Sequence, residues 1–153
     1  MILGNFKVFN TSGRMLGIDW GLRRTGVAVS DESRDFVFAR APIVSDVPED
    51  LLNAILDIVN SEKITGIVIG LPLRGDGTDS ETTAMVRKFA EQLSVRTDVP
   101  IMFIDETLSS ATAQEQMGRV RVRDIKEKLD SNAARVILEN AISMIERTRS
   151  GAE

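Results

Sequence analysis

This chain of 153 residues contains no cysteine and no histidine. Without cysteine it can form neither a disulfide nor a thiolate zinc site. Without histidine it has no imidazole to act as a general base, to complete a Ser-His-Asp or Cys-His triad, or to bind a metal. Any catalysis must therefore rely on carboxylates, lysines, hydroxyl groups or a bound metal ion.

Long apolar runs are also missing, since no uninterrupted stretch approaches the roughly 18 residues of a membrane span. Residues 1–14 are too polar and too broken for a secretory signal, so we expect a cytoplasmic protein that does not contact membranes. The composition, 42% hydrophobic and 27% charged, is typical of one soluble domain. We predict an N-terminal arm over 1–14, which is a candidate extension, one domain over 15–149 and a tail over 150–153.

The net charge of −4 disfavours a general nucleic-acid binder, but the charge is unevenly distributed. Residues 14–24 carry a net charge of +2 and residues 118–128 a net charge of +3, so the rest of the chain carries −9. The segment GRVRVRDIKEK (118–128) combines weak apolar periodicity with high charge, which predicts a mobile loop; such a run is either a solvated loop or a clamp for nucleic acid. The candidate nucleic-acid contacts in the two segments are Arg23, Arg24, Arg119, Arg121, Arg123, Lys126 and Lys128.

The apolar pattern predicts three strands followed by alternating helices and strands. The expected elements are strands over 15–18, 26–30 and 36–44, the last an edge strand because of Pro42; a helix over 48–61; a buried strand over 64–71; a helix opened by a capping box of Thr78 and Glu81; a strand over 101–104; a helix from Ser109 or Ser110 that fades at Gly118; and a closing helix that begins at Asp130. This order predicts a ribonuclease H-like α/β fold, with a mixed five-stranded sheet and helices on both faces.

Four acidic residues are the candidate catalytic groups. Asp19 follows the first strand, which the element order places in the middle of the sheet, and Asp105 and Glu106 follow the last strand. Sites in α/β sheets form at the carboxyl ends of the strands, and a closing helix packed across the sheet would bring Asp130 to the same place. Clustered carboxylates repel one another unless a cation shares them, and oxygen ligands alone select Mg²⁺ or Mn²⁺.

Most of these features also have a purely structural explanation. Asp130 before Ser-Asn-Ala-Ala is a good helix N-cap, and Asp105 suits a cap or a strand-end turn. Asp19 fits such a role less well. A cap or turn hydrogen bond contributes only about 1 kcal/mol, which is poor compensation for placing a carboxylate at the end of a central strand. Glu106 has neither a capping nor a turn preference. The glycines at positions 21, 26, 75 and 77 are turn residues first and phosphate-binding residues second.

Four segments of the chain, in order and in register, resemble a known family. They are GIDWGLRRTGVAVSD (17–31), VIGLPLRGDGTDSE (68–81), FIDETLSSATA (103–113) and LDSNAARVILENAI (129–142). Together they look like the YqgF/RuvX family of Holliday-junction-resolvase-like proteins, also described as pre-16S rRNA nucleases. The resemblance extends over about residues 15–144.

The resemblance implies a ribonuclease H-like fold and a metal-dependent nuclease site. Family acids map onto Asp19, Asp105, Glu106 and Asp130, of which Asp19, Glu106 and Asp130 are the expected ligands of one or two Mg²⁺ or Mn²⁺ ions. The family usually has arginine after the Asp-Glu pair, where this chain has Thr107, so the phosphate contact of that arginine is not expected here. The expected activity is cleavage of structured RNA during maturation of the 5′ end of 16S rRNA. The candidate partner is a ribosomal precursor particle, and the expected form is a monomer or homodimer.

Three other functions fit parts of the sequence. A DNA junction resolvase would use an identical site. The Asp-x-Gly start and the hairpin after it also resemble the phosphate-binding first motif of actin-like and sugar-kinase ATPases, which close two such domains around a nucleotide, whereas 153 residues supply one. A non-catalytic RNA-binding factor in ribosome assembly stays open as well, because four acids give the capacity for catalysis and not turnover.

Overall fold

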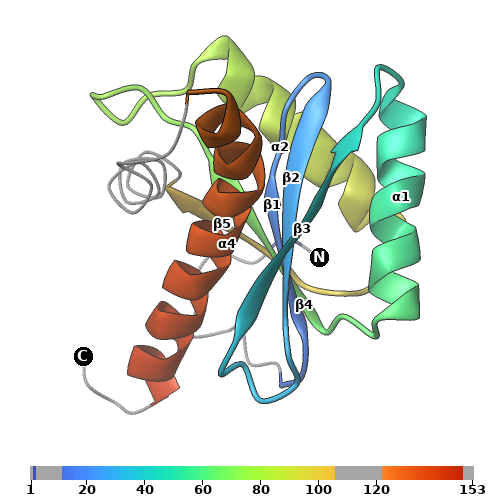
Figure 1. The fold of residues 1–153 in the computed structure, drawn as a ribbon, viewed down its shortest axis with the longest axis vertical. Coiled ribbons are helices and arrows are strands. Elements are labelled where there is room, and N and C mark those ends of the chain that lie inside the picture. Colours follow the sequence, from blue (N-terminus) through green and yellow to red (C-terminus); the bar gives the residue numbers. More distant parts are fainter. Residues whose placement is uncertain (1, 3–11, 106–121, 150–153) are drawn as a thin grey trace.

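The computed structural model describes residue 2, residues 12–105 and residues 122–149, with side chains in the last range only for 132–147. Its elements in chain order are β1 (Met15–Asp19), β2 (Arg24–Ser30), β3 (Val37–Val44), α1 (Pro48–Ser61), β4 (Gly66–Leu71), α2 (Glu81–Ser94), β5 (Ile101–Asp105) and α4 (Val122–Arg149). The strands form one five-stranded sheet in the order β3-β2-β1-β4-β5 (Figure 1). Strand β1 pairs antiparallel with β2 and parallel with β4, so the predicted mixed sheet with β1 in the middle is confirmed.

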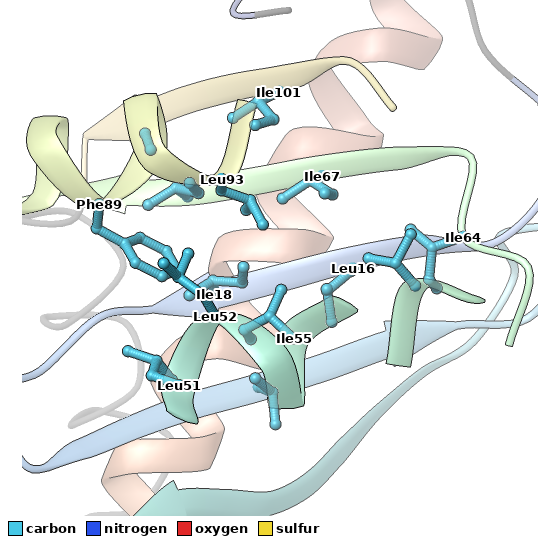
Figure 2. Packing of buried hydrophobic residues seen from close by; sticks show 14 of the residues in the cluster. Leu16, Ile18, Leu51, Leu52, Ile55, Ile64, Ile67, Phe89, Leu93 and Ile101 are labelled. Carbon is cyan, nitrogen blue, oxygen red and sulfur yellow. The ribbon is translucent and has the colours of Figure 1, made fainter. Parts of the chain in front are cut away.

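Helices cover both faces of the sheet, as the sequence predicts (Figure 1). Alternate residues of each strand point to opposite faces. Leu16 and Ile18 of β1 pack against α1 and α2 in one cluster, and Figure 2 shows them beside Leu52, Ile55 and Phe89. Met15 of β1 instead joins the cluster formed with α4, whose buried residues are Ala134, Ile137, Leu138, Ala141, Ile142 and Ile145. The sheet is therefore a layer fixed from both sides.

Most element bounds match the prediction within two residues, and helix α1 matches it at both ends. The predicted capping box of Thr78 and Glu81 is wrong. The N-cap of α2 is Ser80, whose side chain accepts a hydrogen bond from the Thr83 N–H at 3.2 Å, while the Thr83 hydroxyl accepts one from the Ser80 N–H at 2.9 Å. The box is thus shifted by two residues and has the same reciprocal form.

The closing helix begins earlier than predicted. Helix α4 starts at Val122, so the loop predicted over 118–128 is wrong from residue 122 onward. Asp130 is inside the helix and is not its N-cap. The helix predicted from Ser109 or Ser110, and residues 118–121 of the basic segment, lie outside the described residues.

The N-terminal arm is described only at residue 2 and from residue 12 onward. Ile2 forms a parallel bridge with Ile101 and packs against the core cluster on the α1 and α2 face. The Thr65 hydroxyl donates a hydrogen bond to the Ser12 carbonyl. Among the described residues, no helix combines the length and apolar character needed to cross a membrane.

Candidate functional site

Asp19 is the last residue of the central strand β1 and is half-buried. Its place in the strand is fixed because β1 is hydrogen-bonded on both sides, with Asp19 opposite Gly26 of β2 and Ile18 level with Ile69 of β4. Strand alternation puts Asp19 on the same face as Gly17, which packs directly under α4. Gly26 has no side chain, and the residues that flank it on the same face of β2 are Arg24 and Ala28.

Asp105 ends β5 at the same edge of the sheet, but on the other face. Ile104 packs in the cluster with α4, and Phe103 packs in the cluster with α1 and α2. Asp105 follows Ile104, so alternation places it on the α1 and α2 face, opposite to Asp19. Strand β4 separates the two strands, so their backbones are about 10 Å apart. The structure therefore brings Asp19 and Asp105 to one edge and not to one face.

Asp130 belongs to helix α4, which packs on the same face as Asp19. A Cβ added to Gly17 would lie 2.8 Å from the Ala134 carbonyl oxygen and 2.8 Å from the Leu138 Cβ, so this part of α4 crosses β1 closely. The Asp130 backbone lies one helical turn before Ala134. Glu106 and the side chain of Asp130 lie outside the described part of the structure. Among the side chains that are described, no group of three or more acids forms a metal site.

The predicted basic contacts are described only in part. Arg23 is 79% exposed and donates a hydrogen bond to Asp46 at 2.9 Å, and Arg24 begins β2 with an exposed side chain. Arg119 and Arg121 are outside the described residues. Arg123, Lys126 and Lys128 fall on the backbone of α4, and their side chains are not described. Among the side chains that the structure describes, Arg23 and Arg24 are the predicted basic contacts, and they follow the strand end that carries Asp19.

The glycine after Trp20 is required by the turn that joins β1 to β2. A Cβ at Gly21 would come within 2.1 Å of the Arg24 carbonyl oxygen. The Thr25 hydroxyl closes the same turn, accepting from the Gly21 N–H at 3.3 Å. These contacts within the chain hold the turn, and the turn sets the backbone positions of Trp20, after β1, and of Arg23, before β2.

The loop after β4, residues 72–80, is an ordinary turn held by its own residues. The Gly77 N–H donates to the Arg74 carbonyl, and the Arg74 N–H donates to the Thr78 carbonyl. The Thr78 hydroxyl donates to Asp76 at 2.6 Å, and this bond holds the pKa of the Asp76 carboxyl below its usual value. Gly77 has a φ of +83°, a conformation that favours glycine, so the turn itself explains this residue. At Gly75 a Cβ would meet nothing within 4 Å, so the turn does not require glycine there.

An ion pair anchors this loop to helix α2. Arg87 donates to both carboxylate oxygens of Asp79, at 2.8 and 3.1 Å, and its guanidinium lies over the Phe103 ring, 5.7 Å from the ring centre. The hydrogen bonds from Arg87 hold the pKa of Asp79 below its usual value. The contact links the loop after β4 to the end of β5, and no sequence pattern predicts it.

A hollow of about 270 Å³ lies next to the strand end that carries Asp19. It is formed by the turn after β1, the segment before α1, and one side of α2. Its mainly apolar lining includes Trp20, Leu22, Val47, Met85 and Phe89, with Lys88 and Gln92 among its polar residues. No motif of the sequence predicts this hollow. The signal available was the single tryptophan of the chain, placed directly after Asp19.

The fold, with its mixed sheet, two-sided helices and an acid at the end of the central strand, defines a ribonuclease H-like domain. Two solved structures share this fold. Their sequence identity to this chain is low, so the comparison concerns the fold alone. RuvC of T. thermophilus, in complex with a Holliday junction substrate, has a TM-score of 0.58 and 13% identity, over 89% of this chain and 97% of that chain. The yeast mitochondrial Holliday junction resolvase Ydc2 has a TM-score of 0.57 and 10% identity, over 95% of this chain and 85% of that chain.

The chain belongs to the RuvX family, whose model, described as Holliday junction resolvase, matches residues 13–144. A protein of Maridesulfovibrio salexigens named "Putative pre-16S rRNA nuclease" is 41% identical over 82% of this chain and 95% of that protein. A protein of the same name from Nitratidesulfovibrio vulgaris is 36% identical over 91% of this chain and 99% of that protein. The resemblance found in the sequence motifs is thereby confirmed.

Proposed function

We propose that this protein is a metal-dependent nuclease that hydrolyses phosphodiester bonds of structured RNA. Its proposed role is maturation of the 5′ end of pre-16S rRNA in the cytoplasm, on a ribosomal precursor particle. The observation that carries the proposal is the position of Asp19, half-buried at the carboxyl end of the central strand and on the face covered by α4. The RuvX family match and the names of the relatives support the choice of nuclease and of substrate.

The residues at this edge fit a hard divalent cation. The chain has no histidine or cysteine, so its donors are oxygen atoms, which suit Mg²⁺ or Mn²⁺. Asp19, Glu106 and Asp130 are the proposed ligands of one or two ions. Asp105 is the weaker candidate because alternation places it on the opposite face of the sheet. A bound ion would supply an activated water and a stabilised leaving oxygen for phosphodiester hydrolysis.

The chain's own residues hold the substrate and orient the acid. Pairing of β1 on both sides keeps the Asp19 backbone in one position, so its carboxylate needs little reorganisation. Arg23 is a proposed phosphate contact, because its ion pair with Asp46 is largely exposed and an exposed pair costs at most about 1 kcal/mol to exchange. Arg24 and the basic residues at 119–128 are proposed to bind flanking phosphates, which predicts weaker binding at higher salt.

Replacing one acid tests the proposal. We expect Asp19→Asn to lower the rate of Mg²⁺- or Mn²⁺-dependent cleavage of precursor 16S rRNA by at least about a hundredfold, since loss of an outer-shell partner alone costs 10- to 100-fold. The measurement is single-turnover cleavage of end-labelled precursor RNA, with the melting temperature taken for each variant. The matched control is Asp57→Asn, an exposed acid of α1 on the other face of the sheet. Equal cleavage by Asp19→Asn and the wild type would refute the proposal.

A DNA junction resolvase is the second candidate, and the description of the family model favours it. The same preparation should be offered a four-way DNA junction and a matched linear duplex. Paired symmetric cuts in the junction that exceed the cleavage of precursor RNA would select the resolvase. A preference for precursor RNA would select the first proposal.

A further inference from the structure

The hollow beside β1 adjoins the proposed catalytic edge from the opposite face of the sheet. Trp20 follows Asp19 directly and packs against the α1 and α2 cluster, whereas Asp19 is on the α4 face. Figure 2 shows Phe89 of α2 and Leu51 of α1, two further lining residues, on the same side of the sheet as Ile18. One strand end therefore presents an acid to one face and an aromatic ring to the other.

The chemistry of the lining suits a flat ring with polar edges. Trp20, which is half-buried, supplies the accessible aromatic surface, whereas the lining residue Phe89 is only 5% exposed. Leu22 and Met85 supply apolar surface and are 68% and 41% exposed. Gln92 offers amide donors and acceptors. The volume of about 270 Å³ is just below the range of about 300–1,000 Å³ typical of ligand pockets. This size suits a single base better than a helix or strand of a partner protein.

The charges around the hollow favour a ligand that carries phosphates. Lys88 and Asp46 line it, and Arg23 offsets the charge of Asp46 through their ion pair, so the surplus positive charge at the hollow comes from Lys88. Arg24 follows in the same basic segment. A nucleic-acid strand that crosses this edge would place phosphates near these cations and near Asp19, while an unpaired base could enter the hollow. Aromatic side chains commonly hold unstacked RNA bases in this way.

We propose that the hollow lined by Trp20, Met85, Phe89 and Gln92 binds one unstacked base of the RNA strand that is cut at Asp19. This inference rests on the proposed nuclease function and adds a requirement for an unpaired nucleotide beside the cleaved bond. Structured RNA offers such nucleotides at bulges and loops, whereas the bases of a continuous duplex are stacked. The hollow thus selects substrates by the presence of an unpaired base.

The single tryptophan makes this binding directly measurable. The chain has one tryptophan and no tyrosine, so its intrinsic emission at tryptophan wavelengths comes from Trp20 alone. The probes are a two-strand RNA duplex with one bulged adenosine, the same duplex with an abasic nucleotide at the bulge, and the fully paired duplex. Binding is measured in the Asp19→Asn background, by fluorescence and by an independent affinity method, so that cleavage does not interfere.

We expect the bulged adenosine to quench Trp20 emission and to bind about tenfold or more tightly than its abasic counterpart. In Trp20→Ala this preference should disappear, while Trp20→Phe should retain most of it, because phenylalanine keeps an aromatic face. Val95→Ala is the matched apolar control, since Val95 is 83% exposed and lines a separate hollow. Melting temperatures show which variants are folded, and the abasic comparison on unaltered Trp20 does not depend on any substitution in the hollow.

Equal affinity and equal quenching for the bulged and abasic duplexes would overturn the inference. A preference for the bulge that persists in Trp20→Ala would overturn it as well, because the base would then bind elsewhere. Cleavage by the wild type, measured on the same three RNAs, separates this inference from the proposed function. Cleavage that ignores the bulge leaves the nuclease and removes the base site, whereas base-dependent binding without any cleavage leaves the base site and removes the nuclease.

Discussion

Gly17 is the residue at which β1 and α4 leave no room for a side chain. A Cβ there would lie 2.8 Å from both the Ala134 carbonyl oxygen and the Leu138 Cβ, which is closer than van der Waals contact. We expect Gly17→Ala to push α4 from the sheet and lower the free energy of unfolding by about 1–3 kcal/mol. Urea unfolding measures this. Gly75→Ala is the control, because a Cβ there meets nothing within 4 Å, and a comparable loss in that variant would contradict the explanation.

The edge of the sheet at which the two acids lie was predictable from the sequence, but the face on which each acid lies was not. Asp19 and Asp105 were both predicted at strand ends, and both lie at the same edge of the sheet. The face of the sheet on which each acid lies is found by alternation along its strand, starting from a residue whose burial is known. That burial depends on packing against helices that are far away in the sequence. The order of the elements was therefore enough to place both acids at one edge of the sheet. The packed structure was needed to show that Asp19 lies on the face covered by α4.

Strands and helices with strong apolar periodicity were predictable, and helix α4 shows why its first part was not. Helix α1 has buried residues at helical spacing, and its predicted bounds, Pro48 and Ser61, are confirmed. The stretch from Val122 to Lys128 lacks such spacing, but it is rich in arginine, lysine and glutamate, which favour helices without an apolar face. Asp130 had the chemistry of an N-cap, but residues that favour the helix precede it, so the helix continues through it.

The contact between α2 and the loop after β4 makes a specific contribution to acid sensitivity. The hydrogen bonds from Arg87 lower the pKa of Asp79 from its ordinary value of 3.8. A depressed carboxyl pKa stabilises the fold above the unfolded value, and this stabilisation is lost as the pH falls through the folded value. We expect the melting temperature to fall more steeply below pH 3.8 in the wild type than in Asp79→Asn.

The measurement for this pair is thermal unfolding by circular dichroism from pH 6 to pH 2, at low salt. High salt should shrink the difference between the two proteins, because the pair is about half exposed. Asp57→Asn should retain the wild-type acid profile. Parallel profiles for the wild type and Asp79→Asn would show that this ion pair contributes nothing measurable to the stability of the fold.

As a whole, the molecule is a five-stranded layer that presents different chemistry on its two faces at one edge. The α4 face carries Asp19, and the α1 and α2 face carries the hollow with Trp20. The central strand connects the two, so a substrate strand that crosses the edge can contact both. A protein that only binds RNA would need the hollow and the basic residues, but it would not need a half-buried carboxylate on the face covered by α4.

Metal binding to the folded protein distinguishes a metal-dependent nuclease from a non-catalytic RNA-binding factor, and the experiment needs no nucleic acid. If Asp19 is a ligand, Mg²⁺ or Mn²⁺ binds the native state better than the unfolded chain and stabilises it by about 2.7 kcal/mol at a hundredfold excess over Kd. We expect the melting temperature to rise with either ion in the wild type and in Asp57→Asn, and to stay flat in Asp19→Asn. Addition of EDTA should reverse the rise. An equal rise in Asp19→Asn would place the ion elsewhere, and a flat wild-type curve at millimolar metal would favour the non-catalytic RNA-binding factor.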